Sequence, residues 1–187
     1  MQLKSFPLGV LTAAAVMLGA IAIAQEDDIF SFIPDGGRTL LQDVQDRGIP
    51  AGLETAIRTE SGDAEFWRAR LETAAETSAS VAGLDGWQRD TLAQYLAARA
   101  PIEPAAELPR DGRDMALALC QSCHIITVVV TQDRTREAWL GTMNSPSHIE
   151  IETTPREREL LAEYLVLNAG IPIDAIPPAL RAGGASY

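Results

Sequence analysis

Cysteine and histidine are scarce in this chain of 187 residues, which contains two of each. Both cysteines lie in one short motif, so no further cysteine remains to act as a nucleophile. A closed zinc site would need two ligands beyond that motif's cysteines, and the only histidine outside the motif is His148. The many carboxylates show no pairing beyond exposed helix faces. We therefore expect no catalytic residues and no catalysis by the chain alone.

Basic residues are also few, with 15 lysines and arginines against 26 acidic residues and a net charge of −11. Every basic residue after Lys4 is an arginine. This balance argues against binding to nucleic acid or to anionic membrane surfaces. The acidity either favours a partner with a basic docking face or keeps an exported protein soluble.

Beyond the N-terminus, no apolar stretch is long enough to span a bilayer. Lys4 precedes an apolar, alanine-rich run from Leu8 to Ile23, and Ala22-Ile23-Ala24 has the small-x-small pattern of a cleavage site. We predict that residues 1–24 are a signal peptide that directs the protein to the periplasm. Retention of this segment as a membrane anchor is the alternative.

The two cysteines form the motif Cys120-Gln121-Ser122-Cys123-His124. A C-x-x-C-H run is the attachment signature of c-type haem: two thiols form thioether bonds to the porphyrin, and the adjacent imidazole binds the iron. The motif therefore predicts one covalent haem c on Cys120 and Cys123, with His124 as proximal ligand. The alternatives are a thioredoxin-type redox pair, which would follow a strand, and half of a zinc site.

Apolar residues recur at helical spacing along most of the chain, and we predict an all-α fold. Residues 154–157 form a capping box with proline at the first helical position. The β-branched run 125–131 is expected to be an extended loop over the haem edge. Residues 100–112 contain three prolines and are expected to link a helical domain (25–104) to a haem domain (105–187). Helices are expected over 39–47, 63–80, 87–98, from about 113 into the motif, 135–143 and 154–168.

The two halves have the pattern of a repeat. Residues 92–96 match 161–165 at an offset of 69 (92 to 161), and Trp67 matches Trp139 at an offset of 72 (67 to 139). The second offset places residues 48–52 where the second half has the C-x-x-C-H motif. The first half then lacks every haem ligand. The alternative is chance similarity between amphipathic helices.

Residues 110–172 resemble a class I cytochrome c domain, through the helix that leads into C-x-x-C-H, the middle helix with Trp139 and the terminal helix with Tyr164. The whole chain resembles a dihaem cytochrome c whose first haem site has been lost. It also resembles the cytochrome subunits of periplasmic molybdenum or quinoprotein dehydrogenases. The resemblance implies a cytochrome c-like helical domain preceded by a smaller, degenerate one, with Trp139 and Tyr164 lining the haem pocket.

The chain departs from that family at both axial positions. The proline that usually follows the motif is absent, so another acceptor must orient the His124 ring. Two residues are candidates for the distal iron ligand. Met143, one helical turn after Trp139, is preferred because the family uses methionine, whereas His148 is the alternative because it lies in a loop. Arg134 and Arg136 are candidates to neutralise a haem propionate.

These features predict periplasmic electron transfer rather than an enzyme. The chain is expected to be the electron-accepting cytochrome subunit or partner of a periplasmic oxidoreductase, such as a dehydrogenase, with the haemless half as a docking module. The alternatives are a freely diffusing carrier and a haem protein that binds NO or CO at an open distal site. Membrane contact is expected only if residues 1–24 are retained.

Overall fold

The computed structural model describes residues 29–103 and 107–181, and the expected signal peptide lies outside them. Within these residues all regular structure is helical and no strand occurs, which confirms the predicted all-α class. None of the helices described is both long enough and apolar enough to cross a bilayer.

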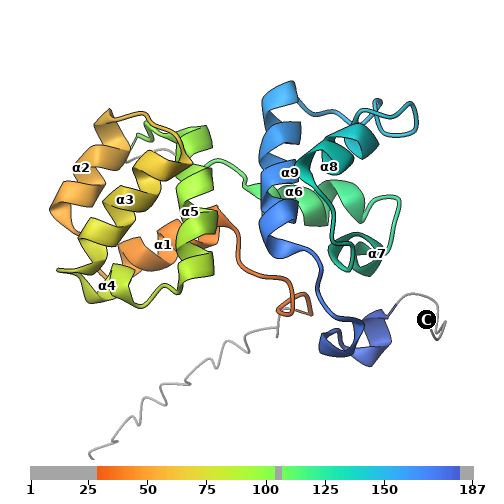
Figure 1. The fold of residues 1–187 in the computed structure, drawn as a ribbon, viewed down its shortest axis with the longest axis horizontal. Helices are drawn as coiled ribbons and strands as arrows, with labels where there is room; N and C mark the ends of the chain where they lie inside the picture. The colour runs from red at the N-terminus through yellow and green to blue at the C-terminus, as the bar shows by residue number, and fades with distance from the viewer. Residues whose placement is uncertain (1–28, 104–106, 182–187) are drawn as a thin grey trace, which may run out of the picture.

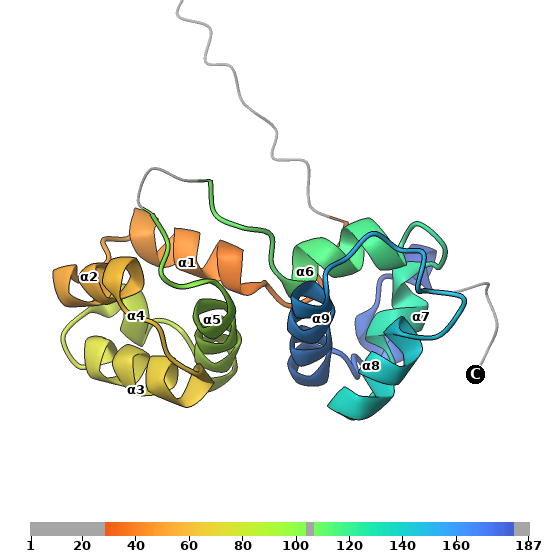
Figure 2. The ribbon, with the colours of Figure 1, turned by 90° about the horizontal axis from the view of Figure 1, so that it is seen from above.

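The helices form two lobes that follow one another along the chain (Figure 1). The first lobe consists of α1 (Gly37–Asp46), α2 (Ala51–Thr59), α3 (Ala64–Ala75), α4 (Ala79–Ala82) and α5 (Gly86–Arg99). The second consists of α6 (Gly112–Met115), the π-helical turn η1 (Ala116–Cys120), α7 (Ile126–Val130), α8 (Arg136–Met143), α9 (Pro155–Asn168) and two short 3-10 turns, η2 (Ile173–Ala175) and η3 (Pro178–Leu180). Each lobe has its own buried core. Helices α5 and α9 lie side by side where the lobes meet (Figure 2).

Side-chain caps define where most of the longer helices begin. The Asp63 carboxylate accepts the backbone N–H of Phe66 at the start of α3, and Asp85 forms a capping box with Gln88 at the start of α5. At α9 the predicted capping box is confirmed, because Thr154 and Glu157 exchange hydrogen bonds and Pro155 occupies the first turn. Such caps satisfy N–H groups that the first helical turn leaves without partners.

The same glycine–tyrosine crossing occurs in both lobes. A Cβ at Gly37 in α1 would lie 2.1 Å from the Tyr95 Cβ in α5, and a Cβ at Gly112 in α6 would lie 2.1 Å from the Tyr164 Cβ in α9. Only glycine allows the helices to approach this closely. By these pairs, α1 in the first lobe corresponds to α6–η1 in the second, and α5 corresponds to α9.

This crossing changes one detail of the predicted repeat. Gly37 and Gly112 are 75 residues apart (37 to 112), rather than the 72 found between the tryptophans, because the connection to the middle helix differs in length. On this register Cys120, Cys123 and His124 correspond to Gln45, Gly48 and Ile49, so the equivalent of the motif is residues 45–49 rather than 48–52. These three first-lobe residues supply neither a thiol nor an imidazole.

The structure differs from the local predictions in three places, the first being the helix expected over 63–80, which is broken at residues 76–78 between α3 and α4. The run 125–131 was expected to be extended, but residues 126–130 form α7, because burial of Ile126, Val129 and Val130 in the second core outweighs the weak helix propensity of β-branched residues. Helix α2 was not predicted. It starts directly after Pro50 and buries Leu53, Ala56 and Ile57 in the core that contains Trp67.

Polar contacts hold the lobes together. The Arg38 guanidinium of α1 donates to both carboxylate oxygens of Asp114 in α6, at 2.6 and 2.7 Å. Burial would raise the pKa of Asp114, but the hydrogen bonds from Arg38 and from the backbone of Asp111 outweigh it and lower the pKa. At the other end of the interface, Asn168 of α9 accepts the indole N–H of Trp87 at 3.1 Å and bonds to Thr91 of α5.

The residues before α1 form an N-terminal strap, defined here as residues 30–34, that packs on the second lobe. Ile33 is 2% exposed and belongs to the second lobe's core, against which Phe30 and Phe32 also pack. The predicted domain 25–104 thus includes a segment whose apolar side chains contact the other lobe.

Candidate functional site

The C-x-x-C-H motif lies at the C-terminal end of a helix. Helix α6 widens into the π-helical turn η1, which ends at Cys120. The chain then turns sharply, and the Cys120 carbonyl accepts the backbone N–H of Cys123 at 3.3 Å and that of His124 at 3.0 Å. The Ser122 hydroxyl donates to the Leu119 carbonyl at 2.6 Å, which satisfies an acceptor that the helix end leaves free. The turn therefore brings both thiols and the imidazole to one end of the helix.

These side chains border a pocket between α7, α8, α9 and the loop after α8. The space between these side chains is about 990 Å³, and part of it is open to solvent. Cys120, Cys123 and His124 line it together with Trp139, Met143 and His148. The structure thus gathers the motif, both distal candidates and the predicted tryptophan around a single cavity.

The two imidazoles of the chain face each other across this pocket. The ring centroids of His124 and His148 are 6.1 Å apart and their planes are inclined by 30°. Two metal–nitrogen bonds of about 2 Å each would place imidazole centres roughly 6 Å apart. The centroid spacing is therefore short enough for both imidazoles to bind one metal ion.

The hydrogen bonds of His148 leave one ring nitrogen available. Its Nδ1 lies 3.0 Å from the hydroxyls of both Ser145 and Ser147. Engagement of one imidazole nitrogen fixes the ring and directs the other, Nε2, to a metal. Among the described residues, no hydrogen bond restrains the ring of His124.

Met143 also lines the pocket, from the last turn of α8. It is half-buried and packs against the second lobe's core, and no polar group of the described residues bonds to its thioether. Both candidates therefore reach the cavity, and only His148 is oriented by neighbouring hydroxyls.

The pocket has apolar walls and a polar edge, the two features that a haem requires. Leu119, Val128, Val129, Leu161 and Leu165 give it apolar walls. The Trp139 indole N–H is buried without a hydrogen-bond partner, and the Arg134 guanidinium lies 5.2 Å from the centre of the Trp139 ring. A flat apolar ring with carboxylate substituents would fill the cavity and supply acceptors for both groups.

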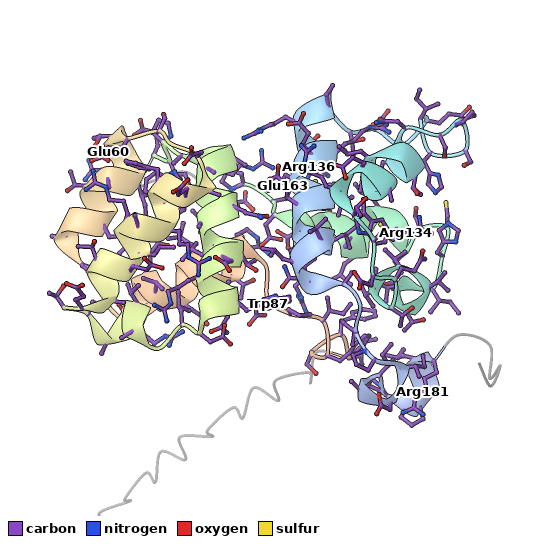
Figure 3. All side chains as sticks on the ribbon, in the orientation of Figure 1. Glu60, Trp87, Arg134, Arg136, Glu163 and Arg181 are labelled. Atoms are coloured by element: carbon purple, nitrogen blue, oxygen red, sulfur yellow. The ribbon has the colours of Figure 1, made fainter. Side chains whose placement is uncertain are left out.

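Two predicted contributors lie elsewhere. Tyr164 does not line the pocket: its hydroxyl donates to the Pro34 carbonyl at 2.6 Å, and its ring packs at the crossing with Gly112. On α9, Leu161 and Leu165 face the cavity and Tyr164 lies on the flank toward α6. Arg136 pairs with Glu163 at 3.6 Å between α8 and α9, whereas Arg134 lies on the side of the second lobe that faces away from the first (Figure 3).

The geometry gives no support to the redox or zinc alternatives. Reactive thiols of redox C-x-x-C motifs usually lie at helix N-termini, where the pKa is lowered. Cys120 ends a helix, and burial raises its pKa to about 11. Within residues 29–103 and 107–181, no three cysteine, histidine or acidic side chains are placed to share a metal ion.

Several residues of the site gave no sequence signal. Ser145 and Ser147 belong to a polar loop, and their role follows only from the fold that brings the loop over the motif. Arg158, which also lines the pocket, was expected only as part of a helix.

With this geometry in hand, comparisons with protein-family models, curated proteins and solved structures found no significant match.

Proposed function

We propose that this protein transfers electrons through a single haem c bound in its second lobe. The observation that carries the proposal is the convergence of the C-x-x-C-H turn and a second, hydroxyl-oriented imidazole on one apolar pocket. The proposal includes a cytochrome c-like fold for this lobe and a periplasmic location, which the N-terminal sequence supports.

Each side chain of the pocket has a definite task. Cys120 and Cys123 would attach the ring through thioether bonds, His124 would bind the iron, and Trp139 would close the apolar wall. When bound, the haem supplies one-electron exchange between ferric and ferrous iron. The apolar walls exclude water and lower the local dielectric, so they influence the potential at which that exchange occurs.

We assign the distal position to His148 in preference to Met143, the residue that family habit favours. The 6.1 Å spacing of the imidazoles and the serine hydroxyls on Nδ1 support this assignment. A second imidazole gives a lower reduction potential than a thioether, because a thioether favours ferrous iron.

Covalent attachment is the first test. The chain, produced in cells competent in cytochrome maturation, should keep its pigment through denaturation and acid–acetone extraction. Cys120→Ala/Cys123→Ala should release it. Release of all pigment by the unmodified chain would refute the proposal.

Optical and EPR spectra then decide the distal ligand. His148→Ala should lose the low-spin signature of the oxidised protein, and its reduced form should bind CO rapidly. Met143→Ala is the matched control and should retain the low-spin signature. The opposite pattern would return the assignment to Met143, and rapid CO binding by the unmodified protein would support a ligand-binding role.

The first lobe supports a role within a larger assembly. Its core is filled where the second lobe is open: Trp67 and Leu71, the equivalents of Trp139 and Met143, are fully buried in a cluster with Leu53 and Ile57 of α2. A carrier has little use for a haemless lobe, and we propose that it docks a periplasmic oxidoreductase. Co-purification with a larger enzyme tests this, and isolation as a lone monomer would favour the diffusing carrier.

A further inference from the structure

The loop between α8 and α9 is held to the second lobe by one side chain of α9. Arg158 extends from the second turn of α9 to residues on both sides of His148. Its Nη2 donates to the carbonyls of Ile149 at 3.3 Å and Ile151 at 3.1 Å. Its Nη1 donates to the Met143 carbonyl and approaches the Asn144 amide oxygen at 3.5 Å. These acceptors span residues 143–151, here called the distal loop.

The rest of the distal loop has only local support. Its other hydrogen bonds join near neighbours, such as the His148 N–H to the Ser145 carbonyl at 2.9 Å and the Ile151 N–H to the His148 carbonyl at 3.1 Å. Asn144, Pro146, Ser147, Ile149 and Glu150 are exposed, so the loop buries little apolar surface of its own. A loop of this kind opens readily unless a longer-range contact restrains it.

We infer that Arg158 is a positioning residue that closes the distal loop over the pocket and thereby presents His148 to the iron. The inference rests on the proposed function. The planar guanidinium carries a permanent charge and five donors in a fixed fork, so one side chain can satisfy several carbonyls at once. Lysine has one nitrogen on a flexible stem and cannot reproduce this set of contacts.

Arg156 provides a matched control on the same helix. Its guanidinium donates to Glu159 at 3.1 Å and to the Ala97 carbonyl of α5 at 3.3 Å, and it makes no contact with the distal loop. Arg156→Gln and Arg158→Gln remove the same charge from positions two residues apart in α9. A difference between them therefore reports the loop contacts rather than net charge.

The test compares haem-loaded Arg158→Gln, Arg158→Lys and Arg156→Gln. Both Arg158 variants should keep covalent haem, show a high-spin fraction when oxidised, and bind CO about tenfold faster than Arg156→Gln when reduced. His148→Ala combined with Arg158→Gln should bind CO no faster than His148→Ala alone, because both changes act through one ligand. Spectra and CO rates of Arg158→Gln equal to those of Arg156→Gln would overturn the inference.

A second readout separates this inference from the proposed function. If the unmodified chain carries no covalent haem, the electron-transfer proposal fails, and hydrogen exchange in the haem-free chain then decides the role of Arg158. Arg158→Gln should speed exchange at the amides of His148 and Ile151 about tenfold relative to Arg156→Gln. Equal exchange in the two variants would overturn the inference.

Discussion

Replacing Gly112 by alanine tests the helix crossing that places the C-x-x-C-H motif. A Cβ at this position would lie 2.1 Å from the Tyr164 Cβ, whereas ordinary contact begins at 3.4 Å. In the alanine variant the two helices would have to separate by about 1.3 Å to relieve this overlap. Helix α6 leads directly into η1 and Cys120, so its displacement from α9 would also shift the proposed attachment site.

The expected loss follows from two opposing effects. Overpacking of a close contact costs about 1–3 kcal/mol, and displacement of Tyr164 also weakens its hydrogen bond to the Pro34 carbonyl, which contributes about 1 kcal/mol. The helix propensity of alanine returns about 0.5–1 kcal/mol. We expect Gly112→Ala to lower the free energy of unfolding by about 2 kcal/mol, and the melting temperature by roughly 4–8 °C.

Urea denaturation followed by circular dichroism measures this change. Gly141→Ala in α8 is the matched control, because nothing lies within 4 Å of its added Cβ, and it should be neutral or stabilising. Hydrogen exchange should locate the loss in α9 rather than α5. Equal stability of Gly112→Ala and Gly141→Ala would refute the steric reasoning.

Three further predictions concern other parts of the fold. The backbone N–H of Thr154 and the nearby Arg110 lower the pKa of Glu157 to about 2 from an ordinary 4.5. The carboxylate therefore contributes its full stabilisation above pH 4.5 and loses it as the pH falls toward 2. Glu157→Gln should flatten the curve of stability against pH in that window, and an unchanged curve would contradict this prediction. Asn168→Ala should lower the free energy of unfolding by about 1–3 kcal/mol, because Trp87 and Thr91 lose their hydrogen-bond partner at the lobe interface. The fluorescence of Trp87 should shift to the red, and unchanged emission would count against that contact. Leu71→Ala should destabilise the first lobe by about 2–5 kcal/mol in denaturation experiments while leaving the visible spectrum of the haem unchanged, and a spectral change would argue against separate cores.

Local sequence signals predicted much of the helical framework. The capping box at Thr154 and the helical spacing around Trp67, Leu92 and Leu161 led to elements that the structure contains, with boundaries displaced by a few residues. These signals depend on residues one to four positions apart, so they can be read without tertiary context.

The remaining features depend on contacts between distant residues. Helix α7 forms from a β-branched run because the second core buries it, and α2 forms where the first lobe must fill the space beside Trp67. The motif itself was visible as a pattern, but Ser145, Ser147 and Arg158, which contact His148 or its loop, carry no local signature. Tyr164 was expected at the pocket from the family resemblance, whereas in the structure its hydroxyl contacts the Pro34 carbonyl and its ring lies at the crossing with Gly112.

The N-terminal strap changes how the chain can be divided. Its Ile33 completes a core whose other members are contributed almost entirely by residues after 112, and its Pro34 carbonyl receives the hydroxyl of Tyr164 in the last long helix. A fragment that begins at residue 105 would leave a hole in its interior, and one that ends at 104 would expose phenylalanines with nothing to cover them. The strap cannot complete these contacts until α9 has been synthesised, so the second core draws on residues from both sides of the first lobe.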